Sequence, residues 1–178
     1  KLMLLLKVQS LAYGYSGVQI ETVQRLVDMF NSDILPVVYE QGSLGASGDL
    51  VPLAHLSLPL LGLGEVYIPG ICENGYYKKR KTKKILQDMG WSPLVLQAKE
   101  GLALINGTQF MTAYGIWSLI KSRRLSYFSD LISSISLESF DCNSNIFDNL
   151  IQIVRPHKGQ SIVAKNVRDF LKGSSIQK

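Results

Sequence analysis

Apolar residues recur at helical spacing along most of this 178-residue chain. Over residues 20–30 they are three and four positions apart, which places them on one face of a helix. Residues 1–13 carry a broader apolar face, and glycines at 14 and 17 interrupt that pattern. Similar patterns predict helices over about 50–61, 78–89, 98–120, 123–139, 144–154 and 160–172. Pro59 is expected to kink or end the first of these nearby. The chain is therefore predicted to be mainly α.

Two short segments depart from helical spacing and indicate extended backbone. Residues 65–70 predict a short strand and turn, with a hairpin partner at about 72–77. Residues 37–39 predict a short extended piece that leads into a glycine-rich loop. No internal repeat is present, and one domain is the default for this length. We expect residues 1–178 to form a single partial domain, a helical-bundle segment with a short β-hairpin near 65–77.

The stretch Gly42–His55 places three glycines and two serines in seven residues before an apolar run. A glycine-dense turn that enters a helix presents backbone N–H groups to an anion, and Asp49 is a suitable helix cap. The stretch lacks the ending of a phosphate-binding P-loop, the second glycine of a hydrolase nucleophile elbow, and the glycine spacing of a dinucleotide fingerprint. Asp49 and His55 lie six residues apart and face different sides of a helix, which argues against a catalytic triad with Ser47.

With these side-chain motifs excluded, the remaining possibility is a reaction of the backbone itself at the triplet Ala46-Ser47-Gly48. The Gly48 nitrogen is unhindered, and its attack on the Ala46 carbonyl, with loss of two waters, one of them from Ser47, gives a methylidene-imidazolone (MIO) ring. Such a ring is an electrophile, a kind of group that ordinary side chains do not supply. The triplet therefore indicates an enzyme that activates an amine or an electron-rich ring. The plain structural alternative is a tight loop before a capped helix.

A polar step lies inside the predicted helix 98–120. Asn106, Thr108 and Gln109 interrupt an apolar stretch, and Gly101 and Gly107 each cost about 1 kcal/mol against alanine in a helix interior. Taken alone, this pattern favours close helix packing, with the amides bonded to neighbouring backbone. Together with the glycine loop, it favours a helix whose polar step faces a functional site.

Three motifs resemble the aromatic amino acid ammonia-lyase family: Gly-Ala-Ser-Gly-Asp-Leu-x-Pro-Leu-Ala-His at 45–55, Lys-Glu-Gly-Leu-Ala-Leu-Ile-Asn-Gly-Thr-Gln at 99–109, and Arg-Pro-His-Lys-Gly-Gln at 155–160. The resemblance covers essentially the whole chain, with residues 76–84 as a basic insertion. It implies an all-α ammonia-lyase fold and an MIO formed from Ala46, Ser47 and Gly48, without an external cofactor or a metal. It also implies that Asn106 hydrogen-bonds at the MIO and the substrate, supported by Asp49, Glu100 and Gln109.

Within the family, the resemblance is nearest to members that act on histidine. It implies elimination of ammonia from L-histidine to give urocanate, with a phenylalanine or tyrosine ammonia-lyase or aminomutase as the alternative. The family's active sites draw on more than one subunit of a homotetramer, and its catalytic tyrosine lies upstream of residue 1. We therefore expect a central fragment of a longer enzyme, inactive by itself, whose partners are an amino acid substrate and further copies of itself.

The net charge of +5 arises from one run, residues 78–84, which holds six basic residues. Such a run can bind nucleic acid, so a non-catalytic helical module that binds nucleic acid there is an alternative of another class. A helical scaffold without chemistry is a third. The run has no interleaved aromatic residues, which favours a solvated surface turn. No apolar run reaches the length of a membrane span, and Cys72 and Cys142 match no metal spacing. These features are typical of a cytoplasmic protein.

Overall fold

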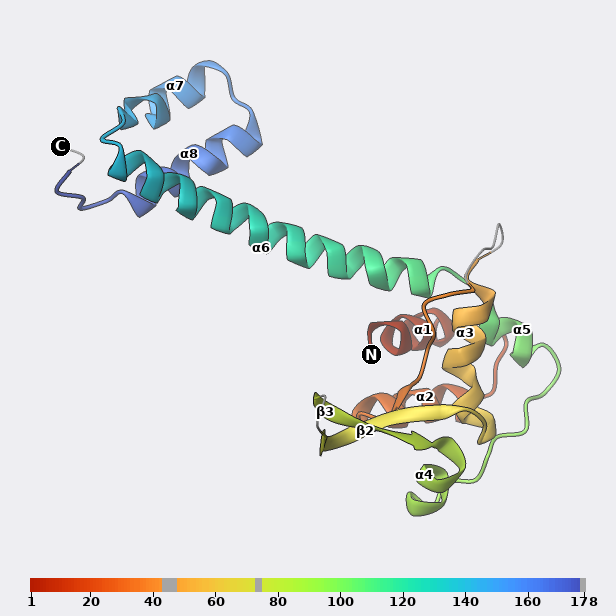
Figure 1. Ribbon diagram of the computed structural model, residues 1–178. Coiled ribbons are helices and arrows are strands. Elements are labelled where there is room, and N and C mark those ends of the chain that lie inside the picture. Colours follow the sequence, from red (N-terminus) through yellow and green to blue (C-terminus); the bar gives the residue numbers. More distant parts are fainter. Residues whose placement is uncertain (43–47, 73–74, 177–178) are drawn as a thin grey trace. The chain divides into compact units, whose positions relative to one another are not determined.

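The computed structural model describes residues 1–42, 48–72 and 75–176. The chain divides into two compact units, residues 1–116 (unit 1) and residues 117–178 (unit 2). Helices account for most of the described chain, and one small sheet lies in unit 1 (Figure 1). The predicted mainly α fold with a short hairpin is confirmed.

The helices of unit 1 enclose an apolar core. They are α1 (Leu2–Ala12), α2 (Ile20–Asn31), α3 (Leu50–Ser57), the 3-10 helix η1 (Leu58–Leu61), α4 (Thr82–Asp88), α5 (Glu100–Ile105) and the first turns of α6 (Gln109–Ser139). The α-helix ends at Ser57 and Pro59 lies in η1, so the prediction that this proline kinks or ends the helix nearby is confirmed. The core side chains come from several helices and include Leu4, Leu11, Leu26, Leu53, Leu56 and Leu104. Burial of these side chains fixes α1, α3 and α5 against one another, and the ends of α3 and α5 carry the predicted site residues.

The sheet of unit 1 is antiparallel, with strands in the order β1 (Leu35–Pro36), β2 (Glu65–Cys72) and β3 (Gly75–Lys81). The predicted hairpin is confirmed, but β3 continues to Lys81, opposite Glu65. The basic residues 78–81 therefore lie in a strand rather than in the predicted surface turn. The helix predicted over 78–89 is present as α4, but it begins only at Thr82. The extended piece predicted at 37–39 lies slightly earlier, as β1, which pairs with β2.

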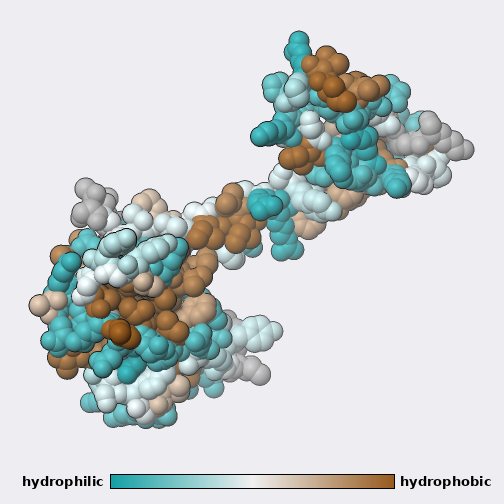
Figure 2. All heavy atoms as spheres, turned by 180° about the vertical axis from the view of Figure 1, so that it is seen from behind, coloured by the Kyte–Doolittle hydropathy of each residue, from teal (hydrophilic) through white to brown (hydrophobic). Residues whose placement is uncertain are grey.

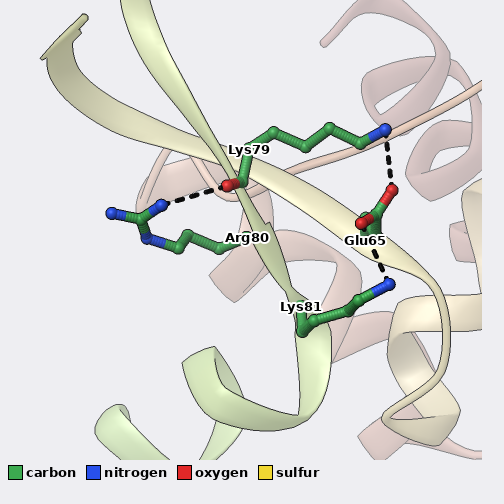
Figure 3. A network of polar contacts seen from close by, with 4 residues as sticks. All are labelled: Glu65, Lys79, Arg80 and Lys81. Atoms are coloured by element: carbon green, nitrogen blue, oxygen red, sulfur yellow. Dashed lines mark hydrogen bonds and ion pairs between the residues drawn. The ribbon is translucent and has the colours of Figure 1, made fainter.

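A carboxylate on β2 accounts for part of this extension of the strand. Glu65 forms ion pairs with Lys79 (2.7 Å) and Lys81 (3.1 Å), two residues on the same face of β3 (Figure 3). The hydrogen bond from Lys79 is the main cause of the lowered pKa of Glu65, and the hydrogen bond from Lys81 adds to it. The Lys79 ammonium also lies 5.7 Å from the ring centre of Tyr39. Part of the positive charge of the run is thus balanced within the sheet.

The single helix predicted over 98–120 is wrong, because the chain forms α5 and α6 with a break between them. Asn106 is extended (φ −84°, ψ 146°) and Gly107 has φ +126°, and neither conformation continues an α-helix. From Gln109, α6 runs without interruption to Ser139, so the helix end predicted between 120 and 123 is also wrong. No proline or glycine stands at residues 116–139 to end the helix.

Unit 2 packs α8 (Lys158–Phe170) against the second half of α6. Asn166 of α8 donates to the Asp130 carboxylate at 2.7 Å, and the rings of Tyr127 and Phe170 meet edge to face at 5.4 Å. The helix predicted over 144–154 is divided into the 3-10 helix η2 (Ser144–Phe147) and α7 (Asn149–Val154). Asp148 causes this division, because its carboxylate accepts from the Leu150 N–H at 2.7 Å and caps α7.

Both units expose large apolar side chains, which appear as brown patches in Figure 2. On α6 and α7 they include Trp117, Leu119, Ile120, Leu125, Ile132, Leu150, Ile151, Ile153 and Val154. Extensive exposed apolar surface of this kind marks a site of interaction with other protein. Among the residues described, no helix is both long and apolar enough to cross a membrane.

Candidate functional site

The two predicted motifs meet at a pair of glycines. Gly48 and Gly107 form an isolated parallel bridge, and the Asp49 N–H donates to the Gly107 carbonyl at 3.4 Å. Gly48 has φ +117°, and a Cβ added to it would lie 2.6 Å from the Gly107 carbonyl oxygen. An L side chain is therefore excluded at residue 48 by both conformation and space. Ala46 and Ser47, the other two members of the predicted triplet, lie outside the described residues.

Asp49 connects this contact to the start of α6. It directly precedes α3, yet it makes no side-chain cap for that helix, so the predicted cap of the following helix is not the one formed. Its Oδ2 instead accepts from the Met111 N–H in the first turn of α6 at 3.1 Å. A carboxylate at a helix start interacts favourably with the partial positive charge there. Asp49 thus fixes the end of the glycine loop between the starts of two helices.

Asn106 lies next to this contact, directly after the last residue of α5. The side chain is exposed, and the residue's own carbonyl accepts a hydrogen bond from the Lys7 ammonium at 2.7 Å. Because Gly107 follows it and touches Gly48, the Asn106 side chain is carried on the backbone segment that meets the glycine loop. The structure therefore brings Gly48, Asp49 and Asn106 together.

Gln109, the first residue of α6, carries a buried polar atom that its surroundings leave unsatisfied. The residue is 9% exposed, and within the described chain its Oε1 has no hydrogen-bond partner. It lines a pocket of about 220 Å³ together with Gln9 and Ser10 of α1 and with Tyr13, which follows that helix. A buried acceptor without a partner is uncommon and marks a place where another polar group completes the structure.

Glu100 is directed toward α2 rather than toward the glycine pair. The residue is 1% exposed, and its Oε1 accepts from the Gln19 N–H (2.9 Å) and the Thr22 hydroxyl (2.7 Å). Its Oε2 accepts from the Gln97 N–H at 2.7 Å. Burial favours a raised pKa, but the hydrogen bonds from Gln97, Gln19 and Thr22 outweigh it, so the pKa of Glu100 is lowered. Glu100 therefore anchors the start of α2 to the start of α5.

Lys7 is a residue of this region that the sequence reasoning missed. Its side chain is 1% exposed, and burial lowers the pKa of its ammonium to about 8. It stands in the apolar run of α1 at helical spacing from Leu4 and Leu11, both of them core residues. That spacing is the signal that identifies a buried lysine, because it places Lys7 on the same face as the two leucines.

The His55 side chain contacts Tyr39. Its Nδ1 accepts from the Tyr39 N–H at 3.4 Å, and the Tyr39 ring packs edge-on against the imidazole at 5.3 Å. Across the described ranges 1–42, 48–72 and 75–176, no group of three His, Cys, Asp or Glu side chains is arranged to hold a metal ion.

Known proteins match this chain along nearly its whole length. The sequence model of a family described as aromatic amino acid lyase matches residues 1–178. A histidine ammonia-lyase of Caldanaerobacter subterraneus subsp. tengcongensis is 44% identical over 173 residues, covering 97% of this chain and 33% of that protein. The chain thus spans about a third of the length of the curated relatives it matches.

Solved structures agree with these sequence matches. The structure of histidine ammonia-lyase from Trypanosoma cruzi superposes with a TM-score of 0.82 at 40% identity, covering 93% of this chain and 31% of that one. The phenylalanine aminomutase of Pantoea agglomerans superposes with a TM-score of 0.87 at 31% identity, covering 99% of this chain and 32% of that one.

Proposed function

Because this chain belongs to the aromatic amino acid lyase family, we propose that it carries the MIO-forming part of an ammonia-lyase that acts on L-histidine. The family resemblance predicted from the three motifs is confirmed. The proposed products are urocanate and ammonia. Support for histidine comes from relatives named histidine ammonia-lyase at 44% identity, against 31% for the phenylalanine aminomutase.

The contact between Gly48 and Gly107 is the observation that carries the proposal. The described residues fit an MIO, because the close approach of the Gly107 backbone favours glycine at residue 48, and a glycine nitrogen is not shielded by a side chain of its own residue. The same contact places Gly107, which follows Asn106, against Gly48, the described member of the triplet in which the ring would form. A loop that forms no MIO has no requirement for two glycines in contact at residues 48 and 107, or for an asparagine at residue 106.

Ring formation uses only atoms of this chain. The Gly48 nitrogen adds to the Ala46 carbonyl carbon, which forms the new C–N bond. The Ala46 oxygen leaves as the first water with the N–H hydrogens of Gly48 and Ser47, so that a C=N bond remains between the Ala46 carbon and the Ser47 nitrogen. The Ser47 hydroxyl leaves with the Ser47 α-hydrogen as the second water, and a carbon–carbon double bond remains. Once formed, the ring supplies an electrophilic carbon that helps the substrate's amine to leave.

The other site residues have supporting roles in this proposal. Asn106 donates or accepts hydrogen bonds at the substrate and the ring from its place after α5. Asp49 holds the loop end against the start of α6, where the helix dipole stabilises negative charge that develops nearby. Gln109 supplies a buried amide beside them. Glu100 acts indirectly, by fixing α2 to α5, the helix that directly precedes Asn106.

The whole enzyme is proposed to be a cytoplasmic homotetramer with an amino acid as its small-molecule partner. The exposed apolar side chains of α6 and α7 support an assembly with further copies. The alternative substrates are phenylalanine and tyrosine, with lyase or aminomutase chemistry, and the aminomutase structure supports them as the second candidate.

Product analysis of the full-length protein that carries these residues tests the substrate. We expect urocanate from L-histidine, at a kcat/KM at least about a hundredfold above that for phenylalanine or tyrosine. A site that hydrogen-bonds the imidazole ring of histidine would have unpaired polar groups when another ring is bound in its place. Cinnamate, coumarate or a β-amino acid as the main product would establish the second candidate. Ser47→Ala is the matched control, since it removes the hydroxyl that the ring requires.

A further inference from the structure

Lys7 is the largest of the fully buried side chains, with 1% of its surface exposed. Lysine is almost never fully buried unless its ammonium is paired. Among the described residues, no carboxylate forms an ion pair with Lys7. Desolvation of this unpaired ammonium opposes folding, and it lowers the pKa of Lys7 to about 8. A buried cation in this setting requires a compensating interaction.

The compensating interaction is with the end of α5. The Lys7 ammonium donates to the Asn106 carbonyl at 2.7 Å and to the Ala103 carbonyl at 3.4 Å. The last carbonyls of a helix have no partner within the helix and carry partial negative charge. Lys7 therefore reaches from α1 to the place where α5 ends and the polar step begins.

The Asn106 carbonyl, to which Lys7 donates, lies one residue before Gly107, which forms the glycine pair with Gly48. Asn106 is followed by Gly107, whose carbonyl accepts from the Asp49 N–H and faces Gly48. Holding the Asn106 carbonyl thus restrains both the Asn106 side chain and the backbone against which Gly48 lies. A methionine or leucine would fill a core position in α1 without the desolvation of a charge, so packing alone does not account for a lysine there.

We propose that Lys7 is a positioning residue that holds the Asn106–Gly107 backbone against Gly48, and so promotes MIO closure at residues 46–48 and orients Asn106. This inference rests on the proposed function. In this role Lys7 acts on the site through the Asn106 carbonyl.

The test compares two variants of the full-length protein that carries these residues. Lys7→Met removes the ammonium and keeps an unbranched apolar side chain. Leu11→Ala is the matched control, because it truncates another buried residue of α1 (2% exposed) and leaves the ammonium in place. For each protein, intact mass gives the fraction that has lost two waters, thermal unfolding gives stability, and steady-state kinetics give kcat and KM.

We expect Leu11→Ala to lower the melting temperature and to retain the full two-water mass deficit. For Lys7→Met we expect about a tenfold smaller fraction with the deficit, and a kcat per closed ring about a hundredfold lower with KM little changed, as small misplacements of site groups produce. A Lys7→Met protein with a complete deficit and an unchanged kcat would overturn the inference. If Lys7→Met does not fold, Lys7→Gln, which is too short for the same contact, is judged by the same outcomes.

The wild-type protein separates this inference from the proposed function. A wild-type protein without the deficit overturns both. A wild-type protein with the deficit, together with an unaffected Lys7→Met, overturns only the role of Lys7.

Discussion

The carbonyl oxygen of Gly107 lies 2.6 Å from the position that a Cβ on Gly48 would occupy. The two residues are far apart in the sequence, and each belongs to one of the motifs on which the family resemblance rests. Their contact places the end of the glycine loop against the break between α5 and α6. Four further predictions test the residues around this contact.

Gly48→Ala is expected to destabilise the protein by roughly 2 kcal/mol or more, because the new Cβ combines a strained φ with a clash against backbone. Urea unfolding of the full-length protein measures the loss. Gly115→Ala is the control, since Gly115 has open space around it and lies inside α6, where alanine favours the helix by about 0.5–1 kcal/mol. Equal stabilities for the two variants would contradict the close approach.

Asp49→Ala is expected to lower the free energy of unfolding by about 1 kcal/mol, because it removes the acceptor for the Met111 N–H. Asp148→Ala removes a similar cap, on the Leu150 N–H of α7, and is expected to lose a comparable amount. The two variants should differ in intact mass, because only Asp49 adjoins the proposed ring. A full two-water deficit in both variants would show that the Asp49 contact is not needed for closure.

The sequence predicted the positions of most helices and of the hairpin, because local spacing and glycines decide them. It missed the break at Asn106, since an apolar stretch with isolated glycines still has helical periodicity, and the break depends on the distant Gly48. It also missed that residues 78–81 lie in a strand, because their ion pairs with Glu65 on the neighbouring strand are not visible in local spacing.

Only part of the site could be predicted, because local spacing does not show which tertiary contacts a residue makes. Gly48 and Asp49 contact Gly107, the residue after Asn106, whereas the roles of these residues at the MIO and the substrate stay predictions. Glu100 shares a motif with Asn106, yet its partners are in α2 and the segment before α5, and a carboxylate's partners depend on tertiary contacts. Lys7 was overlooked because a lysine in an apolar run is usually assigned to the edge of a buried face.

Stability is expected to rise with pH between about 8 and 10.5 because of Lys7. Its pKa is about 8 in the folded protein and 10.5 in the unfolded chain, so the unfolded chain binds more protons in this window. Urea unfolding across the window measures this rise. Lys7→Met should reduce the rise, whereas the exposed-lysine control Lys84→Met should retain it. Parallel curves for wild type and Lys7→Met would contradict the burial of the ammonium.

Glu100→Gln is expected to destabilise the protein by about 1–3 kcal/mol at neutral pH, because the Gln19 and Gln97 N–H groups and the buried Thr22 hydroxyl lose an ionised acceptor. The pKa of Glu100 is lowered by folding, so its contribution is present above about pH 4.5 and is lost as pH falls through the folded pKa. The difference in unfolding free energy between wild type and Glu100→Gln should therefore shrink toward low pH. A difference that stays constant from pH 7 to pH 3 would contradict an ionised, hydrogen-bonded Glu100.

The intact mass of the full-length protein tests the central claim most directly. The account predicts a wild-type protein lighter than its sequence by two waters, with the deficit located in the peptide that contains Ala46, Ser47 and Gly48. Ser47→Ala should show the full mass calculated from its sequence. A wild-type protein that also has its full sequence mass would contradict the formation of an MIO in this chain.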